Sequence, residues 1–453
     1  DEQPQKSFGT QLFRLSPFLS FERLKVKLSV DMVRGLAFGD TDRVASGYRM
    51  LDIFDDRGGL GFSGLRLREA YFSYKTSFGL FKVGQQVSKW GMGILASSGR
   101  DRRDRFGEAW YGDYVARVLF ATKPLGFMSA PGVIGENLYL ALAADLVVED
   151  ENAILKDGDK AFQAIASLFY RHDQNFIGTY VVYRDQEDRD GDRLSVTAMD
   201  LYIKLCTRLQ KGRPLDTVLG IEAEGAYLLG TTDKLEAVYA PDGLAIGSFG
   251  GVLRAWAFFK SIGLESSLEA GYASGDSDMY DSKGRVFTFD PDYNVGLILY
   301  DEVQKAVAAR AIEDASDPSR LSTAPKGLDL SATSGSVTNT IYLFPGIELR
   351  PGRLDTFDLA YLAAWSAAPF ISLYETFRTG APANPYGAPA GDHFLGQEVD
   401  MSYMHVFELW EKTTATIRVQ AGMFWPGGAF EDVQGKKPKV VSKMMASLYL
   451  DWR

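Results

Sequence analysis

Residues 440–453 read VVSKMMASLYLDWR, and this stretch decides the fold class. Its side chains alternate, so an extended strand would place every second residue on the same face. One face would carry Met444, Ala446, Leu448, Leu450 and Trp452, and the other Met445, Ser447, Tyr449 and Asp451. The alternation outlasts the roughly five or six residues of an ordinary strand. It matches the length of about 9–11 residues that a tilted strand needs to cross the hydrocarbon of a bilayer.

The same alternation recurs through the chain and predicts a membrane barrel. Leu24, Val26 and Leu28 alternate with Lys25 and Lys27. Similar runs lie near 197–208, 219–224, 253–260, 357–365 and 415–425, with less regular runs between them. A terminal amphipathic strand that ends in an aromatic residue resembles the C-terminal signature of bacterial outer-membrane β-barrels. We expect about sixteen strands, or eighteen if 7–15 and 40–55 hold two more.

The connections between these strands alternate in length, which favours an up-and-down barrel over a large soluble β-protein. Short turns are expected near 77–79, 172–175, 211–213, 261–262, 351–352 and 410–412. Long loops are expected at 33–63, 89–112, 231–247, 275–336, 367–395 and 426–439. Membrane barrels have short periplasmic turns and long extracellular loops. We therefore expect an N-terminal periplasmic tail over 1–16 and a barrel over 17–453.

Composition excludes several other classes of protein. No stretch reaches the 18 or so apolar residues that a membrane helix needs. Cys206 is the one cysteine among 453 residues, so no disulfide can form within the chain. A net charge of −10 argues against nucleic-acid binding. We expect a bacterial outer-membrane location after removal of a signal peptide, with lipid and lipopolysaccharide as neighbours.

Several motifs resemble the alginate-export-like family of outer-membrane porins. The motifs are KVGQQ at 82–86 with WGMGIL at 90–95, GYASGD at 271–276 with FDP at 289–291, GQEVD at 396–400, and GMFWPG at 422–427. The resemblance implies a porin barrel of up to eighteen strands. It also implies an arginine-rich constriction for alginate, whereas the inward faces here carry mixed charge.

The charged faces of the predicted strands are the main candidate site, because a barrel of this size holds water. The candidate pore-lining residues are Arg23, Lys25, Lys27, Arg66, Arg68, Arg117, Glu222, Glu224, Glu265, Glu269, Glu398, Asp400 and Arg418. The early cations would form a basic sector and the acids an opposed one, which would set ion selectivity. The alternative is plain cross-strand pairing, for example of Lys204 with Glu222.

Three loop features carry further hypotheses, each beside a plain surface-loop alternative. Calcium is the candidate cofactor, held by two acidic loops with Asp188, Asp190 and Asp192 or Asp276, Asp278 and Asp281. Residues 300–314 have helical spacing, so a short helix would fold into the lumen or over the mouth. The run RDRRDR at 100–105 would contact lipopolysaccharide, fold inward or lie in solvent.

The sequence predicts a channel for small hydrophilic, saccharide or anionic solutes and no enzyme. His172, His393 and His405 are the three histidines, and their contexts show no nucleophile–base arrangement. The alternative function is a structural barrel with a plugged lumen, anchoring a periplasmic or surface protein partner.

Overall fold

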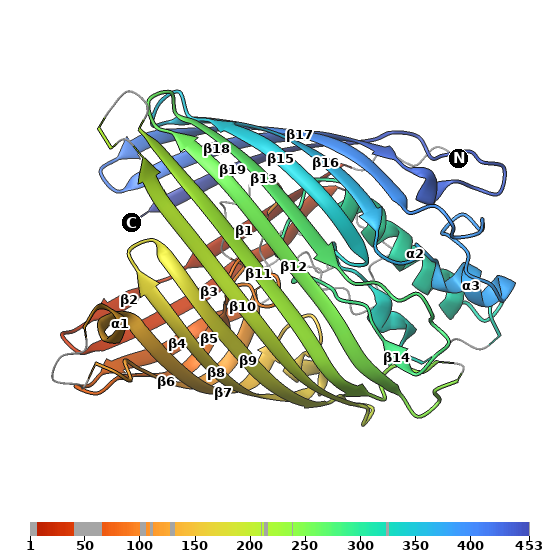
Figure 1. Cartoon of the computed structure of the whole chain (residues 1–453), viewed down its shortest axis with the longest axis horizontal. Helices are drawn as coiled ribbons and strands as arrows, with labels where there is room; N and C mark the ends of the chain where they lie inside the picture. Colours follow the sequence, from red (N-terminus) through yellow and green to blue (C-terminus); the bar gives the residue numbers. More distant parts are fainter. Residues whose placement is uncertain are drawn as a thin grey trace.

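The computed structural model describes residues 7–39, 66–99, 106–108, 112–126, 132–209, 211–212, 216–237, 239–322 and 326–452. In this part of the chain, nineteen strands form one sheet, and it curls into the barrel of Figure 1. The predicted fold class, an antiparallel β-barrel, is confirmed.

Most wall strands pair antiparallel with the next one along the chain. The strands are β1 Phe8–Leu15, β2 Phe18–Ser20, β3 Leu24–Gly39, β4 Arg66–Lys75, β5 Leu80–Ser88, β6 Asp113–Thr122, β7 Leu138–Glu149, β8 Lys160–His172, β9 Asn175–Glu187, β10 Arg193–Leu209, β11 Thr217–Thr232, β12 Leu244–Phe259, β13 Leu264–Ala273, β14 Lys283–Gly284, β15 Thr340–Leu349, β16 Asp355–Ser366, β17 Phe394–Trp410, β18 Thr413–Pro426 and β19 Val441–Trp452. The two-residue β14 instead pairs parallel to β12, so β15 follows β13 in the wall.

The register explains why the alternating sequence produces two chemically different faces. Leu205 lies opposite Ile221 on the outside, and their neighbours Lys204 and Glu222 lie opposite each other on the inside. Cross-strand neighbours thus share a face, and apolar pairs stabilise the outer side as charged pairs do the inner one.

The N-terminal region differs from its predicted form. Residues 8–15 were expected in a tail, but they form β1, which pairs with β3 from Phe8 opposite Gly39 to Leu15 opposite Val30. β2 continues along the same partner after Pro17. The tail expectation is therefore wrong for these residues, and 7–15 does hold a strand beyond the sixteen. The other suspected strand, at 40–55, lies outside the described residues.

The two ends of the barrel have connections of different kinds (Figure 1). The end with the short turns, including 173–174, 260–263 and 411–412, is the short-turn end. The opposite, long-loop end has the segments 89–112, 274–339, 367–393 and 427–440. The predicted alternation of loop length is therefore present. The 123–137 connection is an exception, because it is long and holds α1 Gly132–Asn137 at the short-turn end.

Helical segments lie mostly in the long loops. The predicted helix at 300–314 is confirmed as a π-helical stretch Leu299–Gln304 continued by α2 Lys305–Ser316, and α3 Leu373–Thr379 packs nearby. Shorter turns are Leu155–Asp157, Leu328–Ser331 and Gly428–Phe430. Among the described residues, no helix has the length and apolarity needed to cross a membrane.

Candidate functional site

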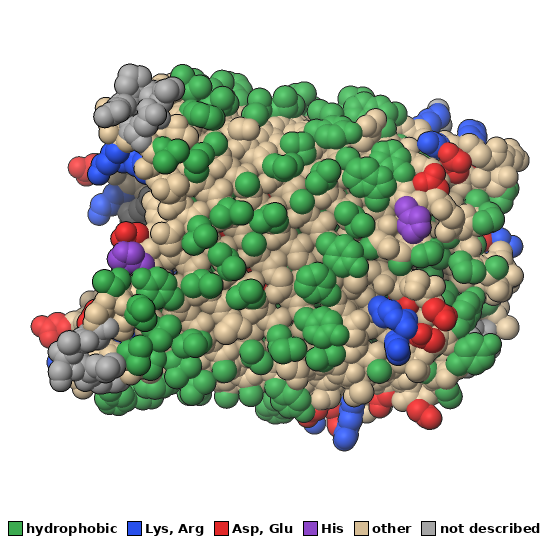
Figure 2. Space-filling view, in the orientation of Figure 1, with side chains coloured by type: hydrophobic (Ala, Val, Ile, Leu, Met, Phe, Trp, Pro, Cys, Tyr) green, Lys and Arg blue, Asp and Glu red, His purple; other side chains and the backbone are tan. Residues whose placement is uncertain are grey.

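The outer surface of the wall is apolar, and ionisable side chains gather at its two ends (Figure 2). Large outward side chains are exposed on neighbouring strands, for example Leu253, Leu268 and Ile347. In contrast, charged residues on the intervening positions are covered: Arg68, Glu398 and Asp400 have no exposed surface. The wall therefore has a greasy exterior and a polar interior, as membrane barrels have.

The predicted basic sector faces inward but is largely neutralised by acids on neighbouring strands. Lys27 lies 2.8 Å from Glu69, and Arg66 forms an ion pair with Glu149. Arg117 makes two hydrogen bonds to Asp145, of 2.7 and 2.6 Å.

The remaining members of the basic sector differ in burial. Arg68 donates to the Ser98 carbonyl at 2.9 Å and lies 3.6 Å from Asp31. Arg23 and Lys25 are exposed near the short-turn end. The most exposed cations of the basic sector are thus those nearest that end.

The predicted acidic residues on β11 and β13 also have partners. Glu222 lies 3.5 Å from Lys204, as cross-strand pairing predicted, and Glu265 lies 3.2 Å from Arg254. Glu269 accepts hydrogen bonds from the hydroxyls of Tyr293 at 3.1 Å and Tyr342 at 2.7 Å. Pairing of neighbours thus accounts for much of the charge on these strands.

Glu398 holds the backbone of an inward-folded loop. Its carboxylate accepts three consecutive amides, from Leu297 at 2.6 Å and from Ile298 and Leu299 at 2.8 Å. Asp400 is buried beside it on β17. Three N–H groups on one carboxylate anchor segment 274–339 at the start of its π-helical stretch.

A second anchor holds segment 89–112. Glu224 accepts hydrogen bonds from the amides of Met92 and Gly93, the latter at 3.1 Å. Gly91 has φ +53°, and a Cβ there would lie 2.5 Å from the Glu224 carboxylate. Only glycine allows the loop this approach. Arg418 contributes on the other side by donating to the Gly107 carbonyl at 3.3 Å.

The inward segments also bind each other and the wall, in part through residues that the sequence did not single out. Asp290 accepts from the Ser97 amide at 2.8 Å, and Asp292 from the Gly112 amide at 2.6 Å. Glu108 accepts from the hydroxyls of Ser447 and Tyr449, the latter at 2.6 Å. Asp290 lies in the FDP motif at 289–291, so this motif was the one indication in the sequence that Asp290 has a particular role.

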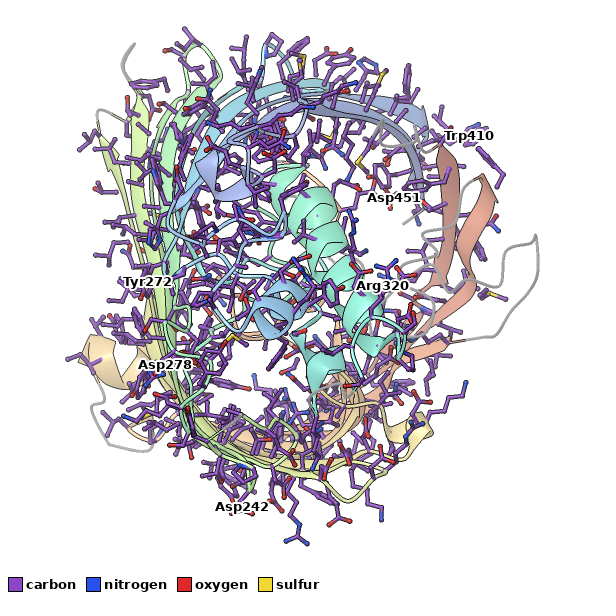
Figure 3. The ribbon with its side chains drawn as sticks, turned by 90° about the vertical axis from the view of Figure 1, so that its right-hand side faces the viewer. Asp242, Tyr272, Asp278, Arg320, Trp410 and Asp451 are labelled. Carbon is purple, nitrogen blue, oxygen red and sulfur yellow. The ribbon has the colours of Figure 1, made fainter. Side chains whose placement is uncertain are left out.

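The long-loop half of the lumen is filled by these segments and has an apolar core. Figure 3 shows α2 and α3 across the barrel interior as seen from this end. Buried side chains of the loops pack with those of the wall, including Ile94, Phe106, Phe287, Leu297, Ile298, Leu299, Tyr342, Leu362 and Phe424. This half of the barrel is therefore packed like a protein interior.

The lumen opens toward the short-turn end. On β17, the inward residues Glu398, Asp400 and Ser402 are buried, Met404 is partly exposed and Glu408 is exposed. β10 shows the same progression, from buried Asp200 and Tyr202 to exposed Arg208. We call this less filled third of the lumen the vestibule.

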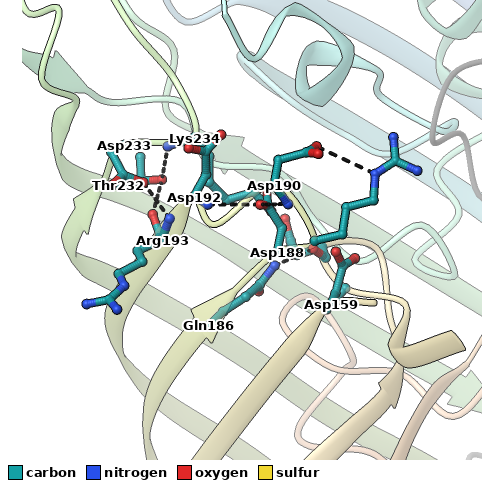
Figure 4. Close-up of polar contacts among 12 residues, drawn as sticks. Asp159, Gln186, Asp188, Asp190, Asp192, Arg193, Thr232, Asp233 and Lys234 are labelled. Atoms are coloured by element: carbon teal, nitrogen blue, oxygen red, sulfur yellow. Dashed lines mark hydrogen bonds and ion pairs between the residues drawn. The ribbon is translucent and has the colours of Figure 1, made fainter. Parts of the chain in front are cut away.

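The two predicted calcium loops have most of their carboxylates engaged by the protein, and Figure 4 shows the first of these loops. Asp188 accepts from the amides of Asp190 and Asp192, both at 3.0 Å, and Asp192 lies 2.8 Å from the Lys326 ammonium. In the other loop, Arg285 contacts Asp276 at 3.0 Å and Asp281 at 2.6 Å, and Asp278 is exposed. No described group of three His, Cys, Asp or Glu residues is placed to hold a metal. Calcium stays a prediction.

Among the described residues, His393 and His405 have partners that do not form a catalytic nucleophile–base arrangement. The run at 100–105 lies outside the described residues. His405 lies 2.7 Å from Asp355 and stacks edge-on against Phe407. His393 Nδ1 lies 3.0 Å from both the hydroxyl and the carbonyl oxygen of Ser366. A nitrogen that donates to this carbonyl has no lone pair left to deprotonate the hydroxyl.

Comparisons with known proteins identify no relative at the level of sequence. No family model matches the chain, and no curated protein does.

Among solved structures, the chain is similar to OccD3 (OpdP) of Pseudomonas aeruginosa, with a TM-score of 0.50, 9% identity and coverage of 99% of this chain and 88% of that one. It is also similar to the outer membrane protein OprD of the same organism, with a TM-score of 0.49, 11% identity and the same coverage. OccK11 (OpdR) matches at 0.47 and 14%, covering 97% of this chain and 88% of that chain. These identities are too low to assign a role, and none of the three descriptions names alginate. With the ladder of paired strands, the match to OccD3 shows the fold, a large antiparallel β-barrel.

Proposed function

We propose that the chain is an outer-membrane channel through which small hydrophilic solutes diffuse passively. The observation that supports the proposal most directly is the division of the wall into an apolar exterior and a charged interior. An interior with so many ionisable groups is stable when water remains around part of it, because burial of isolated charges costs several kcal/mol. The vestibule supplies that water at one end.

The proposal includes a constriction formed by the described parts of the inward segments 89–112 and 274–339. The carboxylates of Glu224 and Glu398 bind the backbone amides of these segments and so hold each segment in one position against the wall. A loop fixed in this way narrows a pore without closing the whole cross-section. The short turns would lie in the periplasm and the long loops outside the cell, with the chain delivered to a Gram-negative outer membrane after signal-peptide removal.

The finer assignments are also proposals. The motif resemblance favours an alginate-export-like channel, and exposed Arg23 and Lys25 favour anionic or saccharide solutes at the vestibule. The paired state of Lys27, Arg66 and Arg117 argues for weak selectivity among ions, since paired charges present little net field.

Ion conduction by purified protein in planar bilayers tests the main proposal. We expect steady channel currents over a wide voltage range, and their complete absence would contradict the proposal. Lys25→Glu should shift the reversal potential in a salt gradient toward cation selectivity, because it reverses an exposed charge of the vestibule. Lys25→Gln, which only removes the charge, should give a smaller shift in the same direction. Unchanged potentials in both variants would place Lys25 off the solute path.

A second candidate function is a structural barrel with a closed lumen that anchors a partner protein. The dry core inside the long-loop half favours it, because tightly packed apolar side chains exclude water and ions. Capture of one stoichiometric partner by a protein that conducts no current would support this candidate over the channel.

A further inference from the structure

Aromatic side chains form a continuous strip on the inner wall. Tyr139, Phe169, Phe176 and Tyr202 lie on the consecutive strands β7, β8, β9 and β10, and we call them the aromatic belt. Neighbouring ring centroids are 5.1, 5.2 and 5.1 Å apart, and the first two pairs are stacked. Their positions alternate in step with the inward Asp145 and Arg184, so the belt faces the lumen.

The belt lies directly below the inward loop, at the entrance from the vestibule. Trp90, at the start of segment 89–112, stacks on Tyr180 at 5.1 Å and meets Phe169 and Phe176 edge-on at 6.4 and 5.9 Å. Its indole N–H donates to Asp200 at 2.6 Å, which fixes the ring. A solute that moves along this side of the lumen would therefore meet the belt at the constriction.

Packing against Trp90 does not account for all the residues of the aromatic belt. Tyr180 and Tyr202 are buried, at 8% exposure each, but Tyr139, Phe169 and Phe176 keep part of their surface open to the lumen. Centroid spacings above 5 Å between stacked rings mean that the rings are offset, so each ring leaves part of its face uncovered by its neighbour. Tyr139 extends the strip beyond the rings that contact Trp90. Apolar surface left exposed in a polar channel indicates a binding role.

Polar groups at both ends of the belt have balanced charge. The Lys123 ammonium lies 5.2 Å from the Tyr139 ring and 3.5 Å from the Glu136 carboxylate. At the other end, Glu222 accepts a hydrogen bond from the Tyr202 hydroxyl and lies 3.5 Å from Lys204. Each end of the belt thus pairs a cation with an acid, so donors and acceptors are available together, which suits hydroxyl groups better than ions.

We propose that the aromatic belt is a binding site for a neutral, ring-shaped solute that carries hydroxyl groups and has one flat apolar face. A pyranose ring has such a face in its C–H groups, and a hydroxylated aromatic ring has one in its π surface. This inference rests on the proposed channel function and specifies its solute class. Trp90 and the belt would hold the ring while the end groups bind its hydroxyls.

Two probes and four variants test the inference in the full chain. Maltohexaose and 4-hydroxybenzamide are titrated by calorimetry in a detergent without a sugar headgroup, and both are added to planar bilayers to measure current block. Phe169→Leu and Phe176→Leu keep apolar bulk but remove the flat ring, so binding of the preferred probe should weaken by about threefold to tenfold. Phe176→Tyr keeps the ring and should bind like the parent. Phe162→Leu changes an outward ring of β8 that is 58% exposed, and it should also bind like the parent.

The outcomes separate the inference from the channel function. Binding of maltohexaose alone assigns the site to saccharides, and binding of 4-hydroxybenzamide alone assigns it to aromatic solutes. If neither probe binds, or if Phe169→Leu and Phe176→Leu both bind as the parent does, the inference is overturned even though currents are present. Binding without any current in the parent overturns the channel function and leaves the belt as a binding site.

Discussion

At the scale of single residues, the carboxylates that fasten loops to the wall are the most informative feature. Glu398 and Glu224 satisfy amides that are about 100 and 130 residues away in the chain. Their alternation with apolar neighbours indicates an inward position but not a partner. The sequence therefore predicted water-exposed pore acids where the structure has buried anchors, because periodicity identifies a face and not what lies against it.

Replacement of Glu398 should release segment 274–339 from the wall. Glu398→Ala leaves the amides of 297–299 without acceptors, and each such loss costs about 1–3 kcal/mol if the group stays buried. We expect faster hydrogen exchange at these amides and larger current fluctuations, with the wall intact. Glu408→Ala, an exposed inward residue near the other end of β17, is the matched control. Equal protection in both variants would contradict an anchoring role.

At the scale of elements, strands were predictable and the internal packing of loops was not. The runs near 24–32, 197–208 and 415–425 each correspond to a strand of the wall. The helix at 300–314 was also foreseen, since helical spacing is local. The contact between Asp290 and Ser97 joins two loops far apart in sequence, and no local pattern encodes such a contact.

The contact between Asp290 and Ser97 should make the stability of the packed loops depend on pH. Burial, together with nearby Asp292 and Glu151, raises the pKa of Asp290 well above the usual Asp range. The folded loops thus hold the proton more tightly than the unfolded chain. Their stability is full below the ordinary Asp pKa of about 4 and falls as pH rises through the higher folded pKa.

Asp290→Asn mimics the protonated form and keeps an oxygen that accepts from Ser97. It should flatten the pH dependence of open-channel current, whereas Asp278→Asn, at an exposed position of the same loop, should leave the dependence as in the parent. A parent current that does not change as the pH rises above about 4, the ordinary Asp pKa, would contradict this role for Asp290.

At the scale of the whole molecule, contact with lipid should stabilise the outer face of the barrel, and loop packing stabilises the inner face. Leu253→Arg places a charge near the middle of β12 on the outside, where a bilayer makes it cost about 2–4 kcal/mol. Leu349→Arg, at the short-turn end of β15, should cost less, since charges near the interface are hydrated. Folding yields in lipid vesicles measure the difference, and equal yields would place Leu253 away from the hydrocarbon.

The apolar core inside the lumen has a consequence for how the protein assembles. Its side chains come from three loops and from strands as distant in sequence as β11 and β18, so it has no lining until the barrel has closed. The loops must therefore pack into the lumen after the strands have closed into a barrel. Denaturant should then release the loops before it unfolds the wall. The resulting intermediate would be an open barrel with a wider pore, which a transient rise in channel current would reveal.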